Sequence, residues 1–485
     1  MLRLILLLLF CYPLLHFSQN SFIQSAINTL NRDPDMRSAE WSFTVLDLSS
    51  GEMIASHNPH KSLSTASSMK VITTATALAI LGPGYRYETF IEYDGDLDGE
   101  ILEGNLYLRG SGDPSLGSDR FGEDLSMDKL LNRWALKIKD AGIREIRGQI
   151  IGDAQIFSTQ ITPDEWAWED IGNYYGAGVS GLNLFENLYY LDLKPGASVG
   201  SATKVIRTRP AMNIRFQNEL RTAGSRTGDN AYIFGAPYTR IRYIRGSIPA
   251  GRPVFTIKGS IPDPTQFAAE RLKMALEKCG IVVEGGATSV RYEKLQGNYQ
   301  NRRRSSLMSH QSPPLSEIVF HTNMKSVNLF AEALARTIAV DLGKFGGNEE
   351  AVESIMKYWG GKGIDTRGMN MRDGSGLSAS NAVSTYQMAS ILRYASRQAY
   401  FSTFEKSLPL AGKSGSLRGM LKGTVAEGRL RAKSGYIAGV RSYTGYVTTQ
   451  SGKKWAFSMI SNNYSCGAGA MRRKLEKLMV AMASQ

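Results

Sequence analysis

A serine and a lysine three positions apart, Ser67 and Lys70, stand at the start of an apolar stretch, TASSMKVITTATALAILGPG (65–84). Residues i and i+3 share one face of a helix, so the lysine amine can reach the serine hydroxyl. Serine is a weak nucleophile until an adjacent base takes its proton. Lysine serves as that base only when burial or a second cation lowers its pKa well below about 10.4. By itself, this spacing favours the simpler interpretation of a lysine that reaches solvent from a helix end.

A second pair of polar residues, Ser326 and Asn328, precedes an expected amphipathic helix in HTNMKSVNLFAEALARTI. A second serine beside the first can pass a proton to a leaving group. An asparagine amide can donate to and accept from a substrate amide at the same time. The alternative is a helix N-cap, a position that both residue types favour.

The third group is the tripeptide Lys433-Ser434-Gly435, at the start of an expected β-run. A cation and a hydroxyl on one strand suit a substrate carboxylate. Gly435 lets a substrate backbone lie close, and the N–H of Tyr436 can join that of Ser67 as an oxyanion hole, where one donor contributes roughly 3 kcal/mol. The same tripeptide occurs at 413–415, but there it lies among glycines in an expected loop.

The elements that must position these residues come from both ends of the chain. EWSFTVLDLSSGEMIASHN (40–58) alternates as a β-hairpin does, and the helix after it stops at Gly82-Pro83-Gly84. Near the other end, RLRAKSG, RSYTGYVTT and KWAFSMISN predict three strands, followed by a helix over AMRRKLEKLMVAMAS. We therefore expect one sheet made from both termini, with helices packed on it. The region between them predicts a β-α-β lobe and then short strands.

In this order, S-x-x-K, S-V-N and K-S-G resemble the signature of penicillin-binding enzymes, which is S-x-x-K, S-D-N and K-T-G. With Lys70 and Ser326 256 positions apart, the chain resembles the serine D-Ala-D-Ala carboxypeptidases with a large insert, peptidase family S13 or class C penicillin-binding proteins. The resemblance covers essentially the whole chain after the leader. Four further stretches resemble the family: LRGSGDPSL (108–116), DEWAWEDIGNYYGAGVSGLN (164–183), SPPLSEI (312–318) and DGSGLSASN (373–381).

The resemblance implies a mixed α/β fold: a penicillin-binding/β-lactamase-like transpeptidase domain, an antiparallel sheet flanked by helices, with large β-rich inserted domains. The expected domains are a signal peptide (1–19), a split catalytic domain (20–85 and 311–485), a β-α-β lobe (86–160) and a β-rich lobe (161–310). The boundary between the two inserted lobes stays open.

The family's roles map onto matching positions of this sequence. They imply a serine peptidase that cleaves D-Ala-D-Ala termini or D-Ala cross-links of peptidoglycan stem peptides, with β-lactams as covalent inhibitors. Ser67 is then the acylated nucleophile and Lys70 its base. Ser326 and Asn328 match the second motif, and Lys433, Ser434 and Gly435 match the third. Asp170 stands where the family has an acid that contacts a diaminopimelate amine; the alternative is a surface carboxylate.

Three positions depart from the family pattern. Val327 replaces the Asp of S-D-N, Ser434 replaces a Thr, and Ala379 stands where the family has an Arg. None removes a group that the mechanism requires, although substrate preference can change. We identify no metal-ligand motif and expect neither a metal nor a cofactor.

The leader, MLRLILLLLFCYPLLHFSQNS, has a basic start, an apolar run and small polar residues, as a secretory signal peptide has. A membrane anchor is the alternative, but Pro13 interrupts a run already short of about 20 apolar residues. We therefore expect an exported, periplasmic protein, cleaved near Ser18 or Gln19. The two cysteines after the leader, Cys279 and Cys466, are expected to be buried free thiols.

The net charge of +13 concentrates in one stretch. Residues 201–252 hold ten Lys and Arg against two acidic residues, with aromatic residues between them. Nucleic acid is excluded as a partner for an exported protein. We expect a peripheral contact with an anionic surface, cell-wall polymer or protein, against the alternative of solvated basic strands.

Two other functions stay open. A β-lactamase shares the acylation chemistry but adds a deacylating base, which we do not identify. A catalytically silent wall-binding scaffold is the non-enzymatic alternative.

Overall fold

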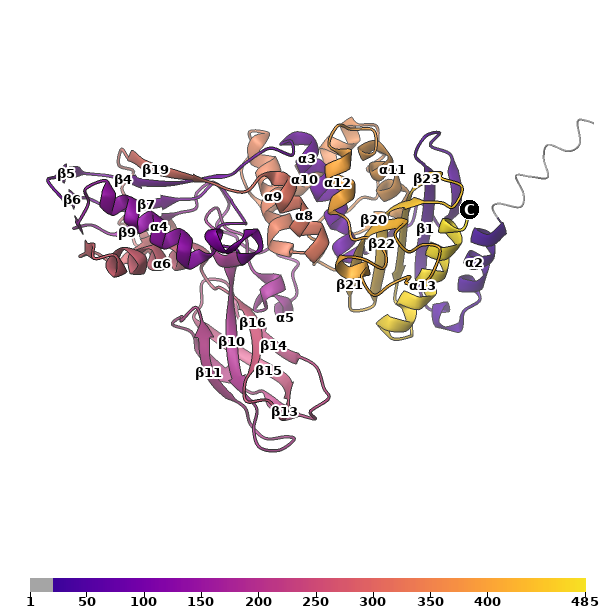
Figure 1. Ribbon diagram of the computed structural model, residues 1–485, viewed down its shortest axis with the longest axis horizontal. Coiled ribbons are helices and arrows are strands. Elements are labelled where there is room, and N and C mark those ends of the chain that lie inside the picture. Colours follow the sequence, from indigo (N-terminus) through magenta and orange to yellow (C-terminus); the bar gives the residue numbers. More distant parts are fainter. Residues whose placement is uncertain (1–20) are drawn as a thin grey trace, which may run out of the picture. The chain divides into compact units, whose positions relative to one another are not determined.

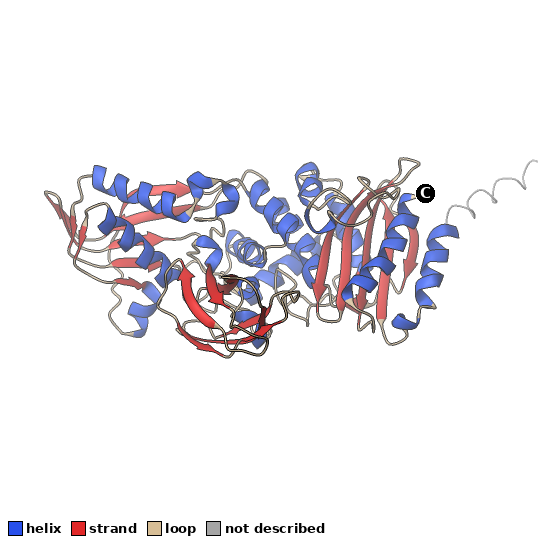
Figure 2. Cartoon of the chain, turned by 60° about the horizontal axis from the view of Figure 1, so that its bottom comes forward, coloured by secondary structure: helices blue, strands red, loops and turns tan. Residues whose placement is uncertain are grey.

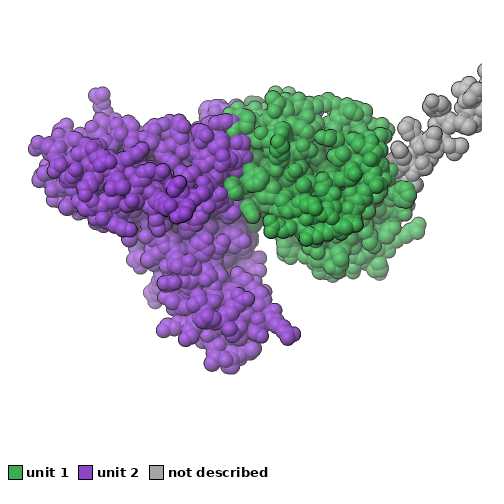
Figure 3. All heavy atoms as spheres, viewed as in Figure 1, with its two compact units in different colours: residues 1–83, 319–326, 352–485 green, residues 84–318, 327–351 purple. Residues whose placement is uncertain are grey.

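The computed structural model describes residues 21–485, so the expected signal peptide lies outside the described residues. Two compact units divide the described chain (Figure 3). Unit 1 holds the residues up to Pro83, the segment Val319–Ser326 and the segment Val352–Gln485, and unit 2 holds Gly84–Ile318 and Val327–Ala351. These units are defined by contacts within the fold, and the expected domain boundaries stay a prediction.

A five-stranded antiparallel sheet forms the centre of unit 1, in the order β2-β1-β23-β22-β21 (Figure 1). The strands are β1 (Glu40–Asp47), β2 (Met53–His57), β21 (Leu430–Ile437), β22 (Val440–Thr448) and β23 (Lys454–Asn462). The first and last segments of the unit meet where β1 pairs with β23, from Glu40↔Asn462 to Asp47↔Trp455. The expectation of one sheet made from both termini is confirmed.

The two faces of this sheet differ in chemistry because side chains alternate along each strand. Apolar residues such as Phe43, Tyr443 and Phe457 join the core shared with helices α2 (Ser21–Asn31) and α13 (Ala468–Ala483). The opposite face presents hydroxyls toward α11 (Thr385–Ala395), where Ser42 and Thr44 bond the Thr385 hydroxyl at 2.5 and 2.8 Å. Helices flank the sheet, as the fold class predicts (Figure 2).

Shorter elements complete unit 1. They are β3 (Ser62–Leu63), the 3₁₀ helix η2 (Ala66–Met69), α3 (Lys70–Ile80), β20 (Val383–Ser384), α12 (Phe401–Ser407) and η7 (Gly415–Leu417). Two helices, α8 (Leu315–Lys325) and α10 (Asn348–Gly361), have residues in both units.

Unit 2 contains two mixed sheets with helices on them. One has the order β18-β9-β7-β4-β19 and the other β17-β8-β6-β5. Their strands are β4 (Glu88–Tyr93), β5 (Asp96–Asp98), β6 (Ile101–Glu103), β7 (Leu106–Arg109), β8 (Glu145–Ile146), β9 (Ile150–Asp153), β17 (Val282–Val283), β18 (Ala287–Ser289) and β19 (Ser305–Gln311). The helices are α4 (Met127–Asp140), α6 (Pro264–Lys278), α7 (Val290–Leu295) and α9 (Asn328–Asp341).

A β-rich lobe of unit 2 carries the basic stretch. Its two small sheets have the orders β11-β10-β16 and β12-β15-β13, with β14 paired to β15. The strands are β10 (Leu188–Lys194), β11 (Lys204–Arg209), β12 (Arg215–Asn218), β13 (Arg221–Ala223), β14 (Asn230–Phe234), β15 (Ile241–Pro249) and β16 (Phe255–Ser260). The short helix α5 (Trp168–Ile171) contacts β14.

The two cysteines are free thiols and are only partly buried, so the expectation of full burial is wrong. Among residues 21–485, no helix has the length and apolar character that a membrane span requires. The same part of the chain holds no cluster of three or more His, Cys, Asp or Glu side chains arranged for a metal ion.

Candidate active site

Ser67 and Lys70 lie in contact in unit 1. Ser67 belongs to η2, and Lys70 is the first residue of α3, so the single helix expected here is a 3₁₀ turn followed by an α-helix. In a 3₁₀ helix residues i and i+3 eclipse each other. Accordingly, the Lys70 Nζ donates to the Ser67 Oγ at 3.1 Å. Lys70 is fully buried, so its amine does not reach solvent as the simpler interpretation supposed.

A backbone carbonyl holds the Lys70 amine from another side. The Lys70 Nζ donates to the Ser375 carbonyl at 2.7 Å. The buried Asp373 shapes this loop, because its carboxylate accepts from the backbone N–H groups of Gly376 and Ser378, both at 2.6 Å. Sequence reasoning missed the carbonyl, although its stretch, DGSGLSASN, belonged to the family resemblance.

Lys433 lies on β21 and supplies a second buried amine. Burial and the charge of Lys70 together hold the Lys433 pKa well below its ordinary value. Its Nζ donates to the Ser434 carbonyl at 2.7 Å, and the Ser434 hydroxyl donates to Ser416 at 2.7 Å. In the other copy of the tripeptide, Lys413 is exposed and pairs with Glu427 at 2.7 Å.

Gly435 brings β21 against the turn that carries Ser67. A Cβ at this position would lie 2.5 Å from the Thr65 carbonyl and 3.0 Å from the Ser67 nitrogen. These are backbone atoms, so a side chain here would force the strand away from η2. The Ser442 hydroxyl on β22 also donates to the Thr65 carbonyl, at 2.6 Å, which ties the sheet to the same turn.

The outer edge of β21 directs backbone N–H groups away from β22. The Ala432 N–H donates to the Pro409 carbonyl at 2.9 Å, on the side opposite β22. Because the strand repeats every two residues, the N–H groups of Ser434 and Tyr436 point the same way. In the described part of the chain, neither the Tyr436 N–H nor the Ser67 N–H has a backbone acceptor. Both donors are thus available to a ligand.

Ser326 stands in a left-handed backbone conformation, with φ of 58°, directly after α8. It lines a cavity of about 370 Å³ together with Ser416 and Arg418. Since the Ser416 hydroxyl accepts a hydrogen bond from the Ser434 hydroxyl, this cavity borders the third motif.

Asn328 and Asp170 lie together in unit 2, joined by Tyr175. Asn328 is the first residue of α9 and not part of a loop, and its Nδ2 donates to the Tyr175 carbonyl at 2.7 Å. Asp170 is half-buried on α5. Burial first, and then the charge of Glu169, raise its pKa to about 6, against a hydrogen bond from Tyr175 that lowers it. Sequence reasoning missed Tyr175.

The predicted site residues therefore form two groups. Unit 1 brings together Ser67, Lys70, Lys433 and Gly435, with Ser434 and Ser326 on either side of Ser416. Unit 2 brings together Asn328 and Asp170. The first group contains a serine hydroxyl, an amine in contact with it and two backbone N–H donors without a backbone acceptor, which are the parts that acyl transfer to a serine requires.

Comparisons with known proteins agree with this chemistry. The model of the D-Ala-D-Ala carboxypeptidase 3 (S13) family matches residues 23–485. The chain is 28% identical over 458 residues to a D-alanyl-D-alanine carboxypeptidase of Actinomadura sp. (strain R39), covering 91% of this chain and 81% of that protein. It is 26% identical over 432 residues to the D-alanyl-D-alanine carboxypeptidase DacB of Haemophilus influenzae, covering 88% of this chain and 86% of that protein.

The crystal structure of penicillin-binding protein 4 from Haemophilus influenzae has the same fold, with a TM-score of 0.79 at 22% identity. It covers 94% of this chain and 97% of that one. The predicted fold class is thereby confirmed. The chain belongs to the D-Ala-D-Ala carboxypeptidase 3 (S13) family and is a serine-type D-Ala-D-Ala carboxypeptidase, as its three motifs predict.

Proposed function

We propose that this peptidase hydrolyses D-Ala-D-Ala termini of peptidoglycan stem peptides, and D-Ala cross-links of the same chemistry, through an acyl-enzyme on Ser67. The observation that carries the proposal is the 3.1 Å contact between the Ser67 hydroxyl and a fully buried Lys70 amine. A buried amine beside a second buried lysine favours the neutral form, and only the neutral form can accept a proton.

In the first half of the reaction, Lys70 takes the proton of Ser67 while the Ser67 Oγ attacks the carbonyl carbon of the penultimate D-alanine. The N–H groups of Ser67 and Tyr436 hold the oxyanion that forms. Ser326 relays this proton from Lys70 to the departing amine as the C–N bond breaks, which leaves Lys70 neutral again. In the second half, water attacks the ester carbonyl and Lys70 takes a proton from the water. Lys70 then gives this proton to the Ser67 Oγ as the ester C–O bond breaks, which releases the acid and restores the Ser67 hydroxyl.

The remaining predicted residues bind the substrate. Lys433 and Ser434 bind the terminal carboxylate. Gly435 keeps β21, along which the substrate backbone lies, close to the turn that carries Ser67. Asn328 binds a substrate amide. Asp170 binds the free amine of a diamino acid in the stem peptide, for which its carboxylate has the opposite charge.

The same nucleophile opens β-lactam rings in this proposal. A second structure of the Haemophilus influenzae penicillin-binding protein 4 is complexed with a β-lactam. We expect a fluorescent penicillin to form a stable covalent adduct with the wild-type protein and no adduct with Ser67→Ala, measured by gel fluorescence and intact mass.

Lys70→Ala keeps the nucleophile and removes its base, so we expect adduct formation to slow by about 10²–10⁴-fold. Rapid turnover of the penicillin would instead identify a β-lactamase. No adduct with a folded wild-type protein would identify a catalytically silent scaffold.

Two further features belong to this proposal. The substrate lies outside the cytoplasm, so the protein is exported to the periplasm, in agreement with the predicted signal peptide. The basic stretch 201–252 contacts an anionic surface: all of its Lys and Arg side chains except Arg242 are exposed. Arg207 and Arg209 share Asp192, so part of this charge is compensated within the lobe.

A further inference from the structure

A cavity of about 870 Å³ lies in unit 2, lined by none of the residues of the three motifs. Its walls come from the start of α6, from α7 and from the turn between β14 and β15. This volume falls within the range of about 300–1,000 Å³ that small-ligand sites occupy. The question is what its side chains can bind.

Hydrogen bonds hold the turn that forms one wall. The fully buried Arg242 donates to the Ala236 and Thr239 carbonyls at 3.2 and 2.9 Å. The Tyr238 hydroxyl donates to the Thr159 carbonyl at 2.5 Å. On the opposite wall, Gln266 of α6 donates to the Ala287 carbonyl at 2.8 Å. The cavity is therefore formed before any ligand arrives.

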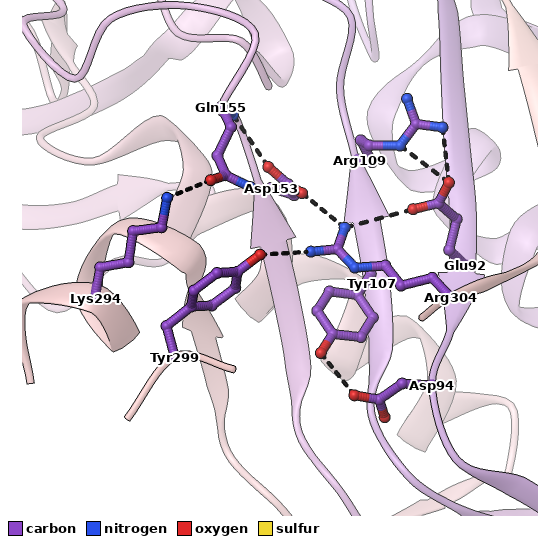
Figure 4. A network of polar contacts seen from close by, with 9 residues as sticks. All are labelled: Glu92, Asp94, Tyr107, Arg109, Asp153, Gln155, Lys294, Tyr299 and Arg304. Carbon is purple, nitrogen blue, oxygen red and sulfur yellow. Dashed lines mark hydrogen bonds and ion pairs between the residues drawn. The ribbon is translucent and has the colours of Figure 1, made fainter. Parts of the chain in front are cut away.

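The third wall, α7, is fixed by a network of polar contacts on the neighbouring sheet (Figure 4). Lys294 at the end of α7 donates to Gln155. Beyond the helix, Arg304 pairs with Asp153 at 2.7 Å and stacks 3.9 Å above the Tyr107 ring. These contacts hold the segment that presents Arg291 and Tyr292 to the cavity.

Arg291 is a cationic side chain of the cavity that is held in place by an aromatic ring. Its guanidinium carbon lies 3.5 Å from the centre of the Tyr238 ring, so the planar group is held flat. Within the described residues, the Arg291 guanidinium makes no hydrogen bond or ion pair. Its charge acts on the partly buried Asp263 carboxyl group of the same cavity, where it opposes the burial that raises the Asp263 pKa. A guanidinium fixed in this way presents two parallel N–H donors, a geometry that matches a carboxylate.

The other groups of the cavity add an opposite charge and an apolar surface. Glu270 pairs with Arg240 at 3.7 Å, a long contact between side chains that are 45% and 61% exposed. Such exposed pairs contribute little, so a ligand can compete for the Glu270 carboxylate. Tyr292 is 51% exposed beside them. The cavity thus offers a carboxylate receptor, an ammonium receptor and an aromatic face.

We propose that this cavity is a second binding site for a peptidoglycan stem peptide, separate from the peptide that reacts with Ser67. A carboxylate of the peptide binds Arg291, a free amine binds Glu270, and a side chain packs on Tyr292. An uncharged glycan chain offers the Arg291 guanidinium no anionic acceptor for its N–H donors, so the structure favours the peptide. This inference rests on the proposed function, because that function supplies the peptide.

The test measures binding of a defined, soluble stem tetrapeptide by calorimetry to the full protein after penicillin has acylated Ser67. We expect one peptide to bind per acylated protein. We expect Arg291→Ala to weaken this binding by tenfold or more, since it removes hydrogen bonds to a charged group. Arg291→Lys keeps the positive charge but cannot donate two parallel hydrogen bonds. Its affinity for the peptide should therefore lie between those of the wild type and Arg291→Ala.

Arg303→Ala is the matched control, because it removes an exposed arginine of the same unit that neither lines the cavity nor belongs to the basic stretch. It should leave peptide affinity unchanged. Thermal unfolding and penicillin acylation show whether each variant is folded. An equal loss in Arg303→Ala, unchanged affinity in Arg291→Ala, or binding of peptide-free glycan in place of the peptide would overturn the proposal.

The experiments can overturn either proposal without overturning the other. If penicillin does not acylate Ser67, the proposed function fails. The dependence of peptide binding on Arg291 is then measured with the unmodified protein, and it still tests whether the cavity binds the stem peptide.

Discussion

Lys70 and Lys433 are two amines buried within reach of each other's charge. Placing two ammonium groups there is costly, so at least one amine is favoured in its neutral form. The lowered Lys433 pKa means that the folded protein binds fewer protons than the unfolded chain between that pKa and the ordinary value near 10.4. The contribution of Lys433 to the free energy of unfolding therefore increases as the pH rises through this window.

Asp170 makes a pH prediction at the scale of one residue. With a pKa raised to about 6, its carboxyl group is mostly neutral at pH 5 and mostly charged at pH 7. Only the charged form attracts a substrate ammonium. We therefore expect the KM for a stem peptide with a free diamino-acid amine to fall as the pH rises from 5 to 7, measured by release of D-alanine.

Two comparisons isolate this effect. Asp170→Asn should remove the pH dependence and raise KM at pH 7 by about five- to tenfold, as the loss of one charge pair of about 1 kcal/mol implies. A peptide whose amine is acetylated should show no difference between wild type and variant. An unchanged KM in Asp170→Asn would assign Asp170 to the protein surface.

The sequence could predict the side chains of this site but not the backbone groups that hold them. The chemistry of the side chains is indicated by their residue types, as for Ser67, Lys70 and Lys433. The carbonyls of Ser375 and Tyr175, which accept from Lys70 and Asn328, carry no such signal, because every residue has one. Only the fold decides which carbonyl is brought to which amine.

At the scale of elements, the outer edge of β21 is the feature on which the chemistry depends. Tyr436→Pro removes the N–H that we assign to the oxyanion hole. Proline is tolerated on the outer side of an edge strand, so the fold should survive. We expect kcat to fall by about 10²–10³-fold with a nearly unchanged unfolding temperature.

Tyr436→Phe is the control for this experiment, because it keeps the N–H and changes only the hydroxyl. Its kcat should stay within about twofold of wild type. A similar loss in both variants would show that the Tyr436 side chain, and not its N–H group, matters. Penicillin acylation rates check the same donor independently of peptide binding.

The five strands of the central sheet of unit 1 were predictable because each has alternating or continuous apolar residues bounded by turns. Two local details could not be predicted from the sequence. Ser67 stands on a 3₁₀ turn that β21 and β22 contact, and these strands come from the far end of the described chain. Asn328 opens α9 directly, although its residue type is equally common in a loop or an N-cap.

At the scale of the whole molecule, the division into units follows contacts that no local pattern reveals. The segment Val327–Ala351 belongs to unit 2, while Ser326, one residue earlier, belongs to unit 1. A hydrophobic helix such as α9 shows in its sequence that it is buried. It does not show which core buries it.

The net charge of +13 supports a prediction about surfaces. Attraction between exposed charges falls with salt, as the Debye length shortens from about 10 Å at 0.1 M to about 3 Å at 1 M. We expect the protein to sediment with vesicles that contain phosphatidylglycerol at low salt, and to be released at about 0.5 M salt.

The double variant Arg221→Glu/Arg226→Glu reverses two exposed charges of the basic stretch and should weaken vesicle binding. Vesicles of phosphatidylcholine alone should not bind. Binding that resists salt, or that the double variant leaves unchanged, would mean that the basic strands are simply solvated.

The pairing of β1 with β23 has a consequence for how the enzyme comes into being. Ser67 is synthesised more than 350 residues before the strand that faces it, β21. A growing polypeptide therefore carries Ser67 without that strand until β21, β22 and β23 leave the ribosome and close the sheet. Reactivity toward penicillin should thus report that these three strands have been made and have joined β1.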